Sequence, residues 1–95
     1  MIPFSRRSAT RSLYCAGSKI TFVPSELSLP AGSKAEIVVR NEQPTPAEFE
    51  STSLHREKVV TPRSQISVYV GPLDPGRYEF FDDFNPSARG FVVVK

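Results

Sequence analysis

The segment Gly71-Pro72-Leu73-Asp74-Pro75-Gly76-Arg77-Tyr78-Glu79-Phe80 contains a tight turn followed by the start of a strand. Asp74-Pro75-Gly76 has proline and glycine at the two central turn positions, the chemistry of a type II turn. Tyr78 and Phe80 then alternate with Glu79, which is the period of two expected of a strand with one buried face. This stretch therefore predicts a turn-and-strand unit of the kind that builds all-β domains.

Short apolar runs separated by turn residues continue on both sides of this segment. Six further runs are predicted to be strands, because they are β-branched, aromatic or alternating and mostly end at turn residues: 20–23, 27–29, 35–39, 57–60, 66–70 and 90–94. Nine prolines and the absence of a sustained 3.6-residue period disfavour long helices. We predict an all-β Greek-key sandwich of about seven short strands.

Length and charge limit the domain organisation and the partners. Ninety-five residues suit one domain, and no apolar run approaches the length of a transmembrane segment. Residues 1–18 contain three arginines, no acid and no recognisable signal peptide, so we expect a disordered tail or an unrecognised targeting segment, with the domain at 19–95. Residues 19–95 carry nine basic and ten acidic side chains without a basic stripe, which argues against nucleic-acid binding.

The reactive side chains give little support for an enzyme. Cys15 is the single cysteine, which excludes an internal disulfide and a CxxC motif. The chain has one histidine, His55, and neither a nucleophile elbow nor an HExxH motif. We therefore expect a non-enzymatic protein.

The order of the predicted strands and the Asp74-to-Phe80 stretch resemble the cupredoxin sandwich. Within that superfamily, Glu48-Phe49-Glu50-Ser51, Glu57-Lys58-Val59-Val60 and Phe80-Phe81-Asp82-Asp83 are similar to the cupredoxin-like domains found with bacterial high-affinity iron permeases. That group includes the amino-terminal domain of periplasmic iron-uptake lipoprotein-like proteins. The resemblance implies a periplasmic location, an iron or copper ion as cofactor, and a membrane iron permease or related uptake protein as partner.

The chain departs from the resemblance at the copper ligands. A type 1 copper site needs two histidines, one cysteine and usually an axial methionine. This sequence has only one of each: His55, Cys15 and Met1. The resemblance puts Asp82 at the cysteine position and Asn85 or Ser87 near the histidine loop. Phe22 and Asp82 take the positions of cysteines that some iron-uptake proteins carry. A blue-copper protein is therefore excluded.

Carboxylates near these positions suggest a site for a harder metal. Glu48 and Glu50 are two residues apart, so on an extended segment they project to one side while Phe49 turns into the core. Asp82 and Asp83 lie on a loop that meets this segment in a cupredoxin-like sandwich. Carboxylates suit Fe3+, Fe2+, Mn2+ or Ca2+, and an imidazole would widen the range to Cu2+ or Zn2+. The predicted metal ligands are Glu48, Glu50, Asp82 and Asp83, with His55 as a further candidate.

A second interpretation stays open at this point. Clusters of acids are common on solvated loops, and Glu57 beside Lys58 reads as an ordinary surface pair on a strand. The alternative is a structural or interaction β-sandwich that binds a protein partner and no metal. The favoured hypothesis is a non-enzymatic metal-binding module for iron or copper handling.

Overall fold

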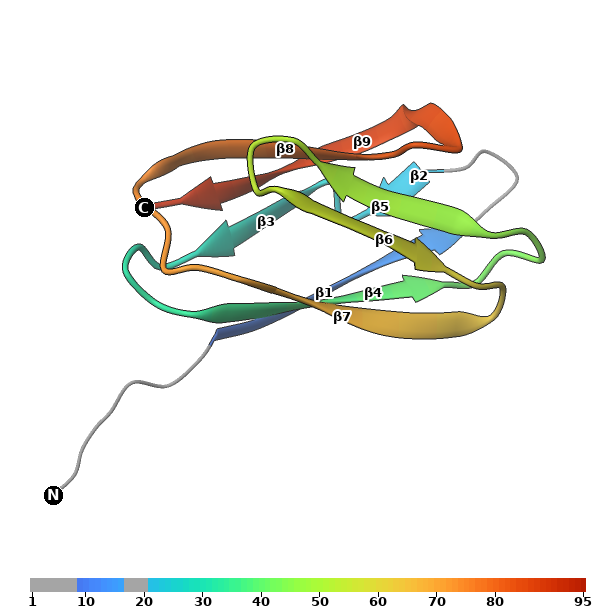
Figure 1. Cartoon of the computed structure of the whole chain (residues 1–95), viewed down its shortest axis with the longest axis horizontal. Coiled ribbons are helices and arrows are strands. Elements are labelled where there is room, and N and C mark those ends of the chain that lie inside the picture. Colours follow the sequence, from blue (N-terminus) through green and yellow to red (C-terminus); the bar gives the residue numbers. More distant parts are fainter. Residues whose placement is uncertain (1–8, 17–20) are drawn as a thin grey trace, which may run out of the picture.

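A computed structural model of the protein describes residues 9–16 and 21–95, and strands dominate it (Figure 1). The four-stranded sheet has the order β2-β1-β4-β7 and the five-stranded sheet the order β3-β9-β8-β5-β6. The described residues contain no helix, which confirms the all-β prediction. The strands are β1 (Ala9–Ala16), β2 (Thr21–Val23), β3 (Glu26–Leu29), β4 (Ala35–Asn41), β5 (Ala47–Ser51), β6 (Arg56–Val60), β7 (Ser64–Val70), β8 (Gly76–Asp82) and β9 (Asn85–Val94).

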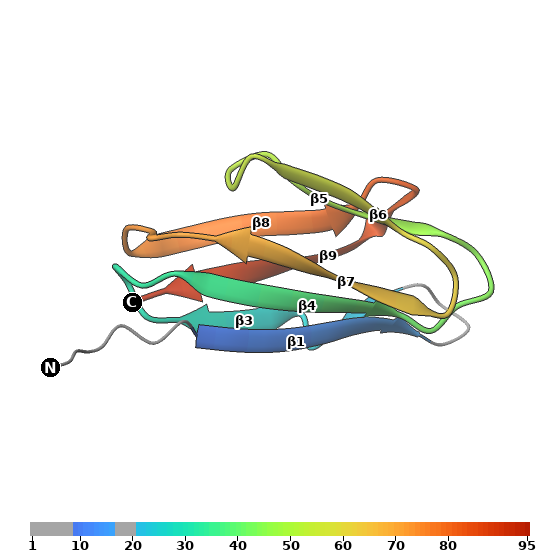
Figure 2. The ribbon, with the colours of Figure 1, turned by 60° about the horizontal axis from the view of Figure 1, so that its bottom comes forward.

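The two sheets pack face to face, with β1, β4 and β7 in one layer and β8 and β9 in the other (Figure 2). Strands distant in sequence pair in parallel, β1 with β4 and β3 with β9, while the remaining pairs are antiparallel. Consecutive strands such as β2, β3, β4 and β5 alternate between the two sheets, so the chain crosses from sheet to sheet, which is consistent with the predicted Greek-key sandwich. The β4–β5 connection, the β6–β7 connection and the β8–β9 hairpin gather at one end of the molecule (Figure 1).

Each of the seven predicted strands has a counterpart in the structure, and two strands were not predicted. One is β5, whose five residues include two glutamates and only two hydrophobic side chains. The other is β1, which lies inside the segment expected to be a disordered tail.

The expected domain boundary at Lys19 is wrong, because β1 belongs to the sandwich. It pairs with β4 over seven residues and with β2 over three. Its inward side chains Leu13 and Cys15 are buried in the core, and Arg11 donates from Nε to the Ser28 carbonyl of β3 at 2.7 Å. The tail prediction failed because the inward face of β1 consists of Ala9, Arg11, Leu13 and Cys15, of which only Leu13 is a large apolar side chain. Residues 1–8 and 17–20 lie outside the described part of the chain.

Three phenylalanines fill the core. Phe22, Phe49 and Phe80 come from both sheets, and each is at most 2% exposed. The rings of Phe49 and Phe80 stack with centroids 5.3 Å apart, and Phe22 meets each of them edge-on. Aromatic pairs of this geometry add stability beyond the apolar area they bury. Phe49, which lies between Glu48 and Glu50, therefore anchors β5 to the core.

Basic side chains close one open side of the sandwich, where the edge strands β6 and β7 face each other. Lys58 donates to the Ser67 carbonyl at 3.2 Å, and Arg56 donates from Nε to the Tyr69 carbonyl at 2.9 Å. These contacts satisfy carbonyls of β7 that no neighbouring strand covers. No helix long and apolar enough to cross a membrane occurs in residues 9–16 and 21–95.

Candidate functional site

Strand β5 presents its two glutamates on the outer face of the five-stranded sheet. Phe49 points inward and is fully buried, so the alternation of a strand sends Glu48 and Glu50 to the opposite face. Glu48 is nevertheless only 8% exposed, whereas Glu50 is partly exposed. The predicted orientation of these two side chains is confirmed.

The two neighbouring aspartates differ in burial, because Asp82 is the last residue of β8 and Asp83 is the first residue of the β8–β9 turn. Phe80 and Asp82 are buried, whereas Phe81 is partly exposed and Asp83 is exposed. Asp82 Oδ1 accepts hydrogen bonds from the backbone amides of Glu48 at 2.9 Å and Phe84 at 3.0 Å. Its Oδ2 is buried without a hydrogen-bond partner among the described residues. Asp82 therefore joins the β8–β9 turn to β5 from the inside of the sandwich.

Three of the four predicted carboxylates form one group. One ligand oxygen each from Glu48, Glu50 and Asp83 lies within 4.8 Å of the other two. The Asp83 amide also donates to the Glu48 carbonyl at 3.0 Å, which fixes the hairpin beside β5. Asp82 is not part of this group, which corrects the prediction that all four acids converge. The error arose because Asp82 continues the inward side of β8, whereas Asp83 already lies in the turn that follows the strand.

His55 is also outside the group. It is exposed in the turn between β5 and β6, where it adopts a positive φ of 57° and its amide donates to the Thr52 carbonyl. The structure therefore gives no imidazole to the carboxylate group within the described residues.

Glu57 of β6 is a member of the site that sequence reasoning missed. The β5–β6 hairpin places Glu57 directly opposite Glu50, and Lys58 opposite Phe49. Lys58 therefore reaches β7 on the inner side, while Glu57 faces the acids and does not pair with its neighbour. Counting back from the apolar Val60 could have identified Glu57. In a strand with Val60 inward, residue 58 also points inward and residue 57 points to the outer face.

The concentration of negative charge changes how the glutamates ionise. The pKa of Glu48 is raised to about 7, first by a side-chain hydrogen bond with Glu57, then by desolvation, and then by the charges of Glu57, Asp83 and Glu50. Desolvation, followed by the charges of Asp83 and Glu57, also raises the pKa of Glu50. The negative charges of Glu48, Glu50, Glu57 and Asp83 therefore repel one another. A cation placed among these carboxylates would offset that repulsion.

The residues present do not fit a type 1 copper centre. Cys15 is fully buried on β1, and burial together with the charge of Asp82 raises the pKa of its thiol to about 12. A thiol with so high a pKa is a poor source of the thiolate that copper requires. His55 lies in the β5–β6 turn, outside the carboxylate group. The exclusion of blue copper made from the sequence agrees with these positions.

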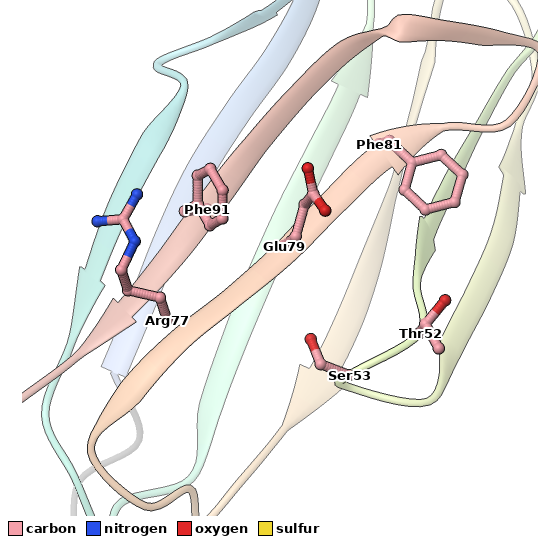
Figure 3. A pocket seen from close by; sticks show the side chains of 6 residues that line it. All are labelled: Thr52, Ser53, Arg77, Glu79, Phe81 and Phe91. Carbon is pink, nitrogen blue, oxygen red and sulfur yellow. The ribbon is translucent and has the colours of Figure 1, made fainter.

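A cavity of about 350 Å³ lies beside the acids on the outer face of the five-stranded sheet. Phe81 lines it and pairs in register with Glu50, so the cavity and the acid group share a border. The charges around the cavity are paired with neighbours. Arg77 lies 4.2 Å above the Phe91 ring, and Arg89 donates to Glu79 at 2.7 Å. The six lining residues are Thr52, Ser53, Arg77, Glu79, Phe81 and Phe91 (Figure 3).

Comparison with known proteins identifies relatives in sequence. The family model described as "Cupredoxin-like domain" matches residues 9–94. An uncharacterized protein of Rickettsia prowazekii (strain Madrid E) is 43% identical over 74 residues, which cover 77% of this chain. The chain spans 59% of the length of that relative.

Solved structures share the fold at low sequence identity. Auracyanin A, a "blue" copper protein of Chloroflexus aurantiacus, is 14% identical with a TM-score of 0.79, over 94% of this chain and all of that chain. The metal-binding domain of the Cu(I)-exporting P-type ATPase CopA of Streptococcus pneumoniae D39 is 16% identical with a TM-score of 0.77, over 95% and 97% of the two chains. Together with the family match, the two-sheet architecture leads to one conclusion: the chain belongs to the cupredoxin-like domain family.

Proposed function

We propose that this domain is a non-enzymatic module that binds a hard metal cation through Glu48, Glu50 and Asp83. The observation that carries the proposal is the approach of three carboxylate oxygens to within 4.8 Å of one another. Oxygen ligands around one cation with bonds of about 2.1–2.5 Å are separated by roughly 3–5 Å, so the spacing suits a shared ion. The three acids come from two segments, β5 and the β8–β9 turn, which the Asp83–Glu48 backbone hydrogen bond holds in place.

The ligand chemistry favours iron over Cu(I). Carboxylates are hard ligands that prefer Fe3+, Fe2+ or Mn2+, whereas Cu(I) prefers thiolate and thioether sulfur. The fold relatives include a domain solved with Cu(I) and a "blue" copper protein. The acid group of this chain offers no sulfur, and Cys15 lies buried in the core. We therefore expect iron to be the preferred ion, and we expect any bound copper to be Cu2+ on oxygen ligands.

We also propose a cellular setting, which is supported by the resemblance of residues 48–51, 57–60 and 80–83 to domains found with bacterial iron permeases. In that setting the domain works in the periplasm and passes its ion to, or receives it from, a membrane iron permease or related uptake protein. Co-purification of the tagged domain with such a permease, with and without iron, tests this part separately from ion binding.

Calorimetric titration of the purified protein with Mn2+, Cu2+ and Fe3+ as its nitrilotriacetate complex tests ion binding. We expect saturable binding of one ion, and a loss of affinity of about tenfold or more in Glu50→Gln and in Asp83→Asn. Glu26→Gln is the matched control, because Glu26 is an exposed acid on β3 of the same sheet and lies outside the acid group.

Two results would reject the metal-binding proposal. One is that no ion binds more tightly than millimolar. The other is that the double variant Glu50→Gln/Asp83→Asn binds as the unaltered protein does. Either result favours the alternative of a structural or interaction sandwich that binds a protein partner and no metal.

A further inference from the structure

Asp82 lies next to two residues of the proposed metal site in the backbone. It is the last residue of β8 and is fully buried, whereas Asp83 follows it in the exposed turn and Glu48 lies on the neighbouring strand β5. The strand register pairs Asp82 with Phe49, the residue after Glu48. Asp82 contributes no oxygen to the group formed by Glu48, Glu50 and Asp83, and its side chain meets that group through backbone amides.

One oxygen of Asp82 holds both segments that carry the ligands. Oδ1 accepts hydrogen bonds from the backbone amide of Glu48 on β5 at 2.9 Å and from that of Phe84 in the β8–β9 turn at 3.0 Å. A bond from an aspartate oxygen to the amide two residues on forms an Asx turn, which fixes the backbone of Asp83. The Asp83 amide itself donates to the Glu48 carbonyl at 3.0 Å. The backbones of Asp83 and Glu48 are therefore joined by two routes.

Strand pairing is irregular at the point where Asp82 makes these bonds. β5 and β8 pair at two positions, Phe49 with Asp82 and Glu50 with Phe81. On the other side of β8, the register with β9 shifts between Phe81 and Asp82. The Asp82 side chain therefore holds the turn in place where the ladder between β8 and β9 is interrupted.

We propose that Asp82 is a positioning residue, which holds the carboxylates of Glu48 and Asp83 close enough to share one ion before that ion binds. This inference rests on the proposed function, since it concerns the same site. Removing a group that holds metal ligands through hydrogen bonds commonly lowers metal affinity by about 10- to 100-fold. A turn that is already ordered also loses little conformational entropy when its carboxylate binds, which favours binding.

Two substitutions of Asp82 separate its hydrogen bonds from its charge. Asp82→Asn and Asp82→Ala both lack the carboxylate charge, but the asparagine oxygen can still accept hydrogen bonds from the two amides. In Mn2+ calorimetry we expect Asp82→Ala to bind at least about tenfold more weakly than Asp82→Asn. Leu13→Ala is the control for lost stability, because it removes a buried side chain of β1 outside the acid group and should bind Mn2+ as the unaltered protein does. Circular dichroism checks that each variant is folded.

Hydrogen exchange of the metal-free protein tests the same arrangement without a substitution. Phe84 lies in an exposed turn, and its amide donates to Asp82. We expect this amide to exchange at least about tenfold more slowly than in an unfolded chain, because its bond to Asp82 must open first. The protection should persist in Asp82→Asn and be lost in Asp82→Ala.

The outcomes separate this inference from the proposed function. If Asp82→Ala and Asp82→Asn bind Mn2+ equally well while Asp83→Asn binds it weakly, the inference fails although the metal site stands. If Asp82→Ala does not fold, Asp82→Asn is compared with Asp83→Asn, and an equal loss of affinity in both overturns the inference. Exchange of the Phe84 amide at the rate of an unfolded chain overturns it as well. If the unaltered protein binds no ion, the proposed function fails and this inference with it.

Discussion

Glu48 combines burial with a surrounding of like charges, and this combination determines the properties of the site. Its position follows from one inward neighbour, because Phe49 must enter the core and strand geometry then turns Glu48 to the other face. Its raised pKa follows from Glu57, from desolvation and from the remaining acids. The direction of the Glu48 side chain could be predicted from the sequence, whereas its raised pKa could be explained only once the strand next to β5 was known.

The raised pKa of Glu48 predicts how the stability of the metal-free protein depends on pH. Its pKa is 4.5 in the absence of the fold and about 7 in the folded protein, so the folded state keeps a proton that the unfolded state releases. This retained proton favours the folded state fully below about pH 4.5, and its contribution to stability is lost as the pH rises through about 7. Urea unfolding at about pH 5 and pH 8 should therefore show a lower free energy of unfolding at pH 8.

The variant Glu48→Gln provides the comparison for this prediction. Its amide does not titrate, so the difference in unfolding free energy between the two pH values should become smaller. An equal difference in both proteins would show that Glu48 is not the source. Added Mn2+ should raise the stability of the unaltered protein more at pH 8 than at pH 5, because the ion competes with the proton.

The resemblance to cupredoxins identified the position of Asp82 in the fold but not the role of its side chain. The position matched the copper-binding cysteine of the fold, and the structure shows a buried side chain that accepts two backbone hydrogen bonds. Asp82 lies two residues after the inward Phe80 on β8 and so turns inward, which leaves Asp83, in the turn that follows, to join Glu48 and Glu50 on the outer face. Phe80, which is fully buried, sets this direction.

At the scale of elements, β9 depends on a glycine in its middle. Gly90 pairs with Phe80 across the β8–β9 ladder, and β3 approaches from the other side, where the Phe91 amide donates to the Ser25 carbonyl at 2.9 Å. A Cβ at Gly90 would collide with the Ser25 carbonyl oxygen and would lie 2.7 Å from the Phe80 ring. This glycine therefore allows the core phenylalanine and two strands to meet.

Gly90→Ala is expected to destabilise the domain by about 1–3 kcal/mol, because the added methyl group overpacks the core. Chemical denaturation measures the loss as a lower midpoint. Gly32→Ala is the matched control, since a Cβ there meets nothing within 4 Å and only the positive φ of 76° opposes it. A loss at Gly90 no larger than the loss at Gly32 would contradict the role given to the close contact.

At the scale of the whole molecule, β1 decides where the domain begins. It lies between β2 and β4 in the four-stranded sheet and contributes Leu13 and Cys15 to the common core. Arg11 on the same strand donates to the Ser28 carbonyl of the other sheet. Removing β1 would leave β2 without a partner and the core open on one side, so β1 is part of the domain.

Leu13→Ala is therefore expected to lower the free energy of unfolding by about 2–5 kcal/mol, the cost of deleting a fully packed leucine side chain. Ser12→Ala changes the preceding residue, whose side chain is exposed on the outer face, and should alter stability by less than about 0.5 kcal/mol. Equal, small effects of the two substitutions in urea unfolding would show that the domain does not need β1.

The fold class, the seven strands with β-branched, aromatic or alternating side chains, the exclusion of a blue-copper centre and the shared face of Glu48 and Glu50 follow from the amino-acid sequence. These features depend on residue type and on the period of two, which are local properties. Tertiary structure alone decided that β1 joins the sheet, that Asp82 turns inward and that Glu57 lies opposite Glu50. The physical reason is that strand partners and register are set by packing between segments far apart in the chain, which no local pattern specifies.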